Sequence, residues 1–132
     1  MNLFLTPKLA RFMPGNGEKN SKLKSSLHTT GGIIYNITLK VERGIEQPWL
    51  EWLENDYAPG IIATNCFTKF TTLKLLELDD LDGSTYALQF FSESFENYER
   101  YLKNFAEDFA EKSFDKWGQK MISFGTVMQV IS

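Results

Sequence analysis

The stretch IIYNITLKVE, residues 33–42, decides the fold because its side chains alternate strictly between two kinds. Its odd-numbered members are apolar and fall on one face: Ile33, Tyr35, Ile37, Leu39 and Val41. A period of two with β-branched residues is typical of a strand that buries one face. The sequence therefore predicts that a sheet begins at Ile33, about a quarter of the way along the chain.

The next segment, IEQPWLEWLENDYAPG (residues 45–60), has the period of a helix. Its apolar residues recur at spacings of three and four, and its acidic residues lie largely on the other side. Pro48 suits a first helical position, and Pro59-Gly60 predicts a break. One more helical turn is expected after Gly60, with Asn65 as a left-handed cap.

Two strands and a long helix complete the predicted order. Residues 67–78 and 84–92 have strand patterns, and Asp82-Gly83 between them is a strong hairpin signal. The helix spans 92–118, with Ser94 as N-cap, Gly118 as stop and a bend at 104–107. A last strand is expected at 120–132. The order β-α-β-β-α-β predicts an α+β, ferredoxin-like fold, a four-stranded antiparallel sheet with both helices on one face.

Charge and composition divide the chain at residue 32. Residues 1–32 carry five Lys or Arg and one Glu, whereas 33–132 carry nine basic and sixteen acidic side chains. Residues 1–32 are expected to be a basic, flexible extension, either native or added by an upstream start, and 33–132 the ferredoxin-like domain. An acidic domain repels phosphates, and no apolar run approaches the ~18 residues of a membrane span, so neither nucleic acid nor a membrane is a predicted partner.

The sequence predicts one sheet face that the helices leave uncovered. The helix-side residues are expected to be Tyr35, Ile37, Leu39, Tyr86, Leu88, Phe90, Ile122, Phe124 and Met128. The uncovered set is then Ile34, Asn36, Thr38, Ala87, Gln89, Phe91, Met121, Ser123, Val127 and Gln129. Such a neutral, partly apolar face is typical of an interface, and a homodimer with open faces together is the expected assembly.

Four segments together resemble a known family: IIYNITLKVE, WLEWLENDYAPGIIATNCFT, YALQFFSESFENYERYL and FGTVMQV. The family consists of short bacterial proteins catalogued as a domain of unknown function, which typically open with Met-Ile-Ile-Tyr-Asn. The resemblance covers residues 33–132 and implies a ferredoxin-like fold similar to the dimeric α/β-barrel group. That group includes cofactor-free monooxygenases, haem-degrading enzymes and isomerases, so the fold alone does not give the chemistry. The resemblance implies no catalytic residues.

The predicted domain lacks histidine, because the single histidine is His28. A neutral-pH general base, a His-dependent nucleophile and a histidine metal or haem site are therefore not expected. The single cysteine, Cys66, excludes a disulfide framework and a zinc–thiolate cage and is expected in the core. No catalytic residue, metal or cofactor is predicted, and the expected compartment is the cytoplasm.

Seven neutral polar or aromatic residues are candidates for contact with a small apolar or aromatic ligand in a cleft: Asn36, Thr38, Trp52, Tyr57, Gln89, Ser123 and Gln129. The amides and hydroxyls would orient a carbonyl or phenol. The alternatives are simple polar pairing across an interface and ordinary aromatic core packing.

Two hypotheses for function stay open at this point. The first is a non-enzymatic homodimeric module that binds a small ligand or a protein partner. The second is a cofactor-free monooxygenase or isomerase acting on an activated aromatic substrate, with Asn36 and Gln89 orienting it and Trp52 or Tyr57 stacking on it. A dimer interface without a cavity would count against the second.

Overall fold

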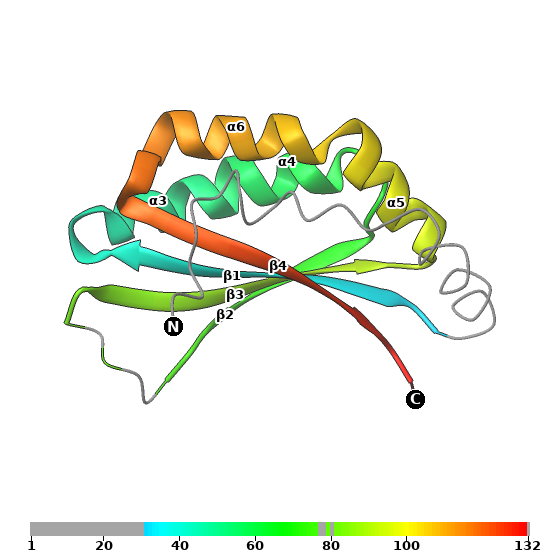
Figure 1. The fold of residues 1–132 in the computed structure, drawn as a ribbon, viewed down its shortest axis with the longest axis horizontal. Helices are drawn as coiled ribbons and strands as arrows, with labels where there is room; N and C mark the ends of the chain where they lie inside the picture. Colours follow the sequence, from blue (N-terminus) through cyan, green and yellow to red (C-terminus); the bar gives the residue numbers. More distant parts are fainter. Residues whose placement is uncertain (1–30, 77–78, 80, 132) are drawn as a thin grey trace.

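The computed structural model describes residues 31–131 except 77, 78 and 80, and it forms a sheet covered by helices on one side (Figure 1). The strands are β1 (Ile33–Glu42), β2 (Lys69–Lys74), β3 (Gly83–Ser92) and β4 (Met121–Gln129). Their order is β2-β3-β1-β4, and every neighbouring pair is antiparallel. The predicted ferredoxin-like α+β fold is confirmed. The predicted extension, apart from Gly31 and Gly32, lies outside the described residues.

The first helical region is continuous where a break was predicted. It begins with a short turn, η1 (Arg43–Ile45), and continues through α3 (Glu46–Trp52), a π-helical turn η2 (Leu53–Tyr57) and α4 (Ala58–Ile62). Pro59 lies in the first turn of α4. The preceding π turn is wider than an α turn, which relieves the collision of a proline ring with the carbonyl four residues earlier. The predicted break was therefore wrong, and Pro48 is the third residue of α3 and not the first.

The second helical region follows the local signals in the sequence. The Ser94 hydroxyl accepts a hydrogen bond from the Asn97 backbone N–H at 3.1 Å, which confirms the predicted cap. The predicted bend is a full interruption at Phe105 (φ −130°), which separates α5 (Phe95–Asn104) from α6 (Ala106–Trp117). Gly118, with φ +60°, ends α6 as predicted. None of the helices in the described ranges is long and apolar enough to cross a membrane.

The start of β3 depends on one glycine, at the point where it meets the end of β1. Gly83 has φ +141°, and a Cβ atom there would lie 1.9 Å from the carbonyl oxygen of Val41. Only glycine tolerates both conditions. The predicted antiparallel pairing of the two strands is confirmed, but the predicted turn at Asp82-Gly83 is wrong: Lys74 is opposite Tyr86, a register that a two-residue turn at these positions does not allow, and Gly83 is the first residue of β3. The strand before the turn is shorter than predicted and ends at Lys74. The last strand is also shorter and spans residues 121–129, not 120–132.

The two faces of β1 and β3 are as predicted, but those of β4 are reversed. Residues directly opposite in an antiparallel pair share a face. Leu39 is opposite Ser123 and Val41 is opposite Met121, which is 2% exposed. The helix side of β4 therefore consists of Met121, Ser123, Gly125, Val127 and Gln129. The open side consists of Ile122, Phe124, Thr126 and Met128.

The reversal has a simple cause in the composition of β4. This strand carries apolar and neutral residues on both sides, so its pattern does not distinguish a one-residue shift that moves every side chain to the other face. The β1 strand has no such ambiguity. The core that β1 helps to form is rich in aromatic rings, and Cys66, 1% exposed, lies within it as expected.

Candidate functional site

The seven predicted contact residues divide between the two sides of the sheet. Asn36, Thr38 and Gln89 lie on the open face, as predicted. Ser123 and Gln129 lie on the helix side of β4, which corrects their predicted placement. Trp52 and Tyr57 belong to α3 and η2 in the helical layer. A single constellation of Asn36 and Gln89 with Trp52 or Tyr57 is therefore not assembled within one chain.

The open face has a hydrogen-bonded ladder at its centre. The Gln89 Nε2 group donates to Asn36 Oδ1 at 3.2 Å, and Asn36 Nδ2 donates to Thr38 Oγ1 at 3.1 Å. The β1–β3 register places Asn36 directly opposite Gln89, which makes the first of these bonds possible. Asn36 is only 9% exposed. The ladder is thus a fixed polar strip, because each amide orientation is set by its neighbour.

The surroundings of this ladder are apolar or neutral. Leu73 on β2 is 42% exposed and Met128 on β4 is 39% exposed. Charged side chains on this face occur toward the strand ends, where Lys69 lies over the Phe91 ring at 5.3 Å. The apolar and small residues around the ladder are Ile34, Leu73, Ala87, Phe91, Ile122, Phe124 and Met128. An uncovered face of this kind is typical of a contact surface.

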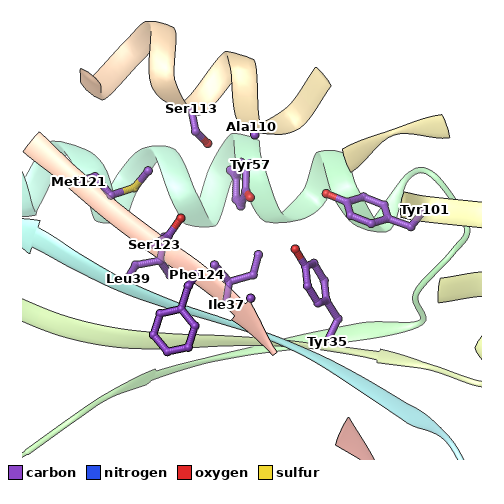
Figure 2. Close-up of a pocket in the computed structure, with 11 residues that line it drawn as sticks. Tyr35, Ile37, Leu39, Tyr57, Tyr101, Ala110, Ser113, Met121, Ser123 and Phe124 are labelled. Atoms are coloured by element: carbon purple, nitrogen blue, oxygen red, sulfur yellow. The ribbon is translucent and has the colours of Figure 1, made fainter. Parts of the chain in front are cut away.

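The helix side holds a small cavity between the sheet and the helices (Figure 2). Its volume of about 20 Å³ is enough for one water molecule. Apolar walls come from β1, β4 and α6, and the hydroxyl-bearing residues that line it are Tyr35, Tyr57, Tyr101, Ser113 and Ser123. In Figure 2 the hydroxyls of Tyr35 and Tyr101 point toward one another. The cavity is therefore lined by hydroxyl groups and contains no charged side chain.

The π-helical turn η2 positions Tyr57 in this cavity. Such single π turns are frequent at functional sites because they rotate a side chain away from its α-helical direction. The Tyr57 ring packs against Trp52, with ring centroids 4.8 Å apart, and against Phe109 at 6.1 Å. Trp52 also meets Trp117 edge to face at 5.7 Å. Trp52 supports Tyr57 from behind and does not line the cavity.

One phenol of the helical layer, Tyr98, lies beside Tyr35, with ring centroids 5.5 Å apart. Burial raises the pKa of Tyr98 far above its usual range, and the neighbouring Tyr35 raises it further. At the other end of the sheet, the Tyr86 hydroxyl donates a hydrogen bond to the Glu46 carboxylate and holds the pKa of Glu46 below its usual value. Among the described residues no three His, Cys, Asp or Glu side chains come together as metal ligands. Neutral hydrogen bonding is thus the chemistry that the cavity offers.

Three hydroxyl-bearing residues of the cavity were not among the sequence candidates: Tyr35, Tyr101 and Ser113. Both tyrosines have the sequence pattern of core residues, and both are buried. Only the structure shows that they also line a cavity. Ser113 carried a signal in the sequence. It is a polar residue within the apolar stripe of α6, between Phe109 and Trp117, and it is 4% exposed.

Comparison with known structures shows the same fold. A dimeric ferredoxin-like protein from an uncultured marine organism aligns with TM-score 0.60 and 7% identity over 77% of this chain and 97% of its own. An ethyl tert-butyl ether d (ethd) family protein from Bacillus halodurans C-125 aligns with TM-score 0.56 and 11% identity over 75% of this chain and 99% of its own. The solution structure of a hypothetical Arabidopsis thaliana protein aligns with TM-score 0.52 and 17% identity over 78% of this chain and 89% of its own. At these identities the likeness shows the fold alone.

Sequence comparison gives the family. No curated protein matches the chain. Residues 32–131 match the family described as "Domain of unknown function (DUF4286)". That range includes all four strands, both faces of the sheet and the cavity. The chain belongs to the DUF4286 family.

Proposed function

We propose that this chain is a non-enzymatic homodimeric binding module whose two copies pair through their open sheet faces. The observation that carries the proposal is the open face itself, with its neutral ladder of Asn36, Gln89 and Thr38 and exposed apolar neighbours. Helices cover only the other face of the sheet. Water often covers the second face of an antiparallel sheet, but a face with exposed apolar residues and few charges is more typical of an interface. The dimeric ferredoxin-like protein from the marine organism supports the idea that this fold accommodates a dimer.

The ladder suits pairing with an identical copy. A side-chain amide presents donors and an acceptor together, so two amides related by a two-fold axis satisfy each other. Within the chain, Gln89 Nε2 and Asn36 Nδ2 each make one hydrogen bond, which leaves further amide capacity at the surface. Two lysines of this face, Lys40 and Lys69, lie away from its centre, opposite Thr85 and Phe91. A second copy therefore meets both the polar and the apolar parts of this surface.

Sedimentation velocity of the full chain tests the proposal. Wild-type protein is expected to be a dimer at tens of micromolar. The Gln89→Glu variant keeps the side-chain shape but brings two carboxylates together across the two-fold axis, and its dissociation constant should rise at least about tenfold, or about 1.4 kcal/mol.

Gln119→Glu is the matched control, because Gln119 is exposed beyond α6 and the variant has the same net charge. It should dimerise like the wild type. A wild-type monomer at tens of micromolar would overturn the proposal, and so would equal dissociation constants for the two glutamate variants.

A further inference from the structure

The cavity on the helix side concentrates hydroxyl groups in an otherwise apolar layer. Ser113 on α6 and Ser123 on β4 present their hydroxyls from opposite walls (Figure 2). Neither hydroxyl is hydrogen-bonded to another of the described residues. Neither oxygen is fully shielded from solvent, so both hydroxyls can hydrogen-bond to water. The space of about 20 Å³ between them is enough for one water, which would satisfy both.

The lining of the cavity defines what else fits there. No Asp, Glu, Lys, Arg or His lines it, so an ion would enter without a counter-charge, at a high desolvation cost. Serine and tyrosine hydroxyls donate as well as accept hydrogen bonds. A ligand oxygen that accepts hydrogen bonds can therefore take the place of the water with little loss, whereas an apolar group cannot.

The cavity reaches solvent along the edge strand β4. Gly125 lines the cavity and is exposed, and Val127, the next residue on the same side of β4, is 39% exposed. The Tyr35 ring lies so close to Gly125 that a Cβ atom there would be 2.9 Å from it. The Tyr35 ring and Val127 thus form an apolar surface that leads from the hydroxyls to the outside.

From this arrangement we infer that the cavity is the polar end of a binding site for a small neutral molecule with an acceptor oxygen, such as a ketone or an ether. Its oxygen replaces the water between Ser113 and Ser123, and its apolar body lies against Tyr35 and Val127. The inference rests on the binding part of the proposed function. It does not require the dimer, because the site lies on the opposite side of the sheet from the open face.

NMR titration of isotope-labelled protein tests the inference with two probes of similar shape. Cyclohexanone carries the oxygen, and methylenecyclohexane has a CH₂ group in its place. Cyclohexanone is expected to shift the backbone amides of Ser113, Ser123 and Gly125 saturably in the millimolar range. Methylenecyclohexane is expected to bind at least about tenfold more weakly, because it displaces the water without offering the two hydroxyls an acceptor oxygen.

Two variants assign the effect to the hydroxyls. Ser113→Ala and Ser123→Ala should each weaken cyclohexanone binding by about three- to tenfold, the equivalent of one neutral hydrogen bond. Alanine favours the helix at position 113, so a folded protein is expected. Thr71→Ala removes an exposed hydroxyl on the open side of β2 and should leave binding unchanged.

Three outcomes would each overturn the inference: equal affinity for the two probes, wild-type affinity in both serine variants, or no saturable shift at tens of millimolar. Sedimentation of the same sample reports the dimer separately. A dimer that does not bind the ketone refutes this site and leaves the pairing proposal standing, and a monomer that binds it does the reverse.

Discussion

The two faces of β1 carry alternate residues of one short stretch, and the helices cover only one of these faces. Tyr35, Ile37 and Leu39 lie under the helices and are at most 6% exposed. Asn36 and Thr38 lie between them on the other side and hold a hydrogen-bonded ladder with Gln89. The helix face is buried by its own chain, and the open face has the neutral character that another molecule could bury.

The comparison also separates two kinds of recognition. The open face is broad, and its polar groups are already fixed by one another. The helix face closes around a space of about 20 Å³ that is lined by hydroxyls. A broad, self-complementary surface suits a second copy of the chain, whereas an enclosed space suits a single functional group of a small molecule. Each face can therefore be altered without altering the other.

The largest expected effect on stability comes from shortening a leucine to alanine, and each face of the sheet offers one leucine for this comparison. Leu88 on β3 is fully buried under the helices, and Leu73 on β2 is 42% exposed on the open side. Leu88→Ala should lower the free energy of unfolding by about 2–5 kcal/mol, because it leaves a cavity in the core. Leu73→Ala should lower it by only about 0.5 kcal/mol in the monomer. Urea denaturation at submicromolar concentration measures both.

Dimerisation should respond to the two leucine variants in the opposite order from stability. Leu73→Ala should weaken dimerisation, and any change in Leu88→Ala should follow from its loss of stability alone. Similar losses of unfolding free energy in both variants would mean that the open face is buried within the monomer, and the comparison between the faces would fail.

Local signals in the sequence predicted most of the fold. The alternation of β1, the Ser94 cap and the Gly118 stop depend on residues that are neighbours in the chain, and the structure confirms all three. These features fix the order of elements and hence the topology. The face of β1 that becomes the core was predicted for the same reason, since its apolar set is unambiguous.

Features that depend on distant residues were predicted less well. The faces of β4 are set by pairing with β1 and by the approach of Tyr35 to Gly125, and neither appears in the local pattern of β4. The continuity of the helix through Pro59 was missed for a local reason, because it depends on the π turn just before the proline. Consequently the seven site candidates were assigned to one cleft, although Ser123 and Gln129 lie across the sheet from Asn36 and Gln89.

An intermediate effect is expected from adding one methyl group to β4, and it tests the reversed faces directly. Gly125 has no positive φ, so alanine suits its backbone and would otherwise stabilise the strand. Its Cβ atom, however, would lie 2.9 Å from the Tyr35 ring, which must move. Gly125→Ala should therefore lower the free energy of unfolding by about 1–3 kcal/mol, as overpacking does.

The neighbouring residue is the control for this change. Thr126 lies on the open side of β4, opposite Asn36, and is exposed. Thr126→Ala should change the free energy of unfolding by no more than about 0.5 kcal/mol. Stabilisation by Gly125→Ala together with a large loss in Thr126→Ala would show that β4 has the opposite phase, with Thr126 toward the helices.

The smallest effect concerns the Tyr86–Glu46 hydrogen bond, which ties β3 to the start of α3 on the helix side. The hydrogen bond from Tyr86 is the largest cause of the lowered pKa of Glu46, with a smaller contribution from Ser84. Tyr86→Phe should lower the free energy of unfolding by about 1 kcal/mol at pH 7. This is less than the loss of a fully buried hydrogen bond to a charged group would cause, because Glu46 is partly exposed to solvent.

The sign of the pH dependence follows from the direction of that shift. A carboxyl whose pKa is lower in the folded state stabilises the fold above its unfolded value of about 4.3, and this stabilisation is lost as the pH falls through the folded pKa. The difference in unfolding free energy between wild type and Tyr86→Phe should therefore shrink from pH 7 to pH 3. In the Glu46→Gln background, Tyr86→Phe should lower the unfolding free energy by an amount that does not change between pH 7 and pH 3. An equal pH dependence in both backgrounds would mean that another carboxylate is responsible and that this contact contributes packing alone.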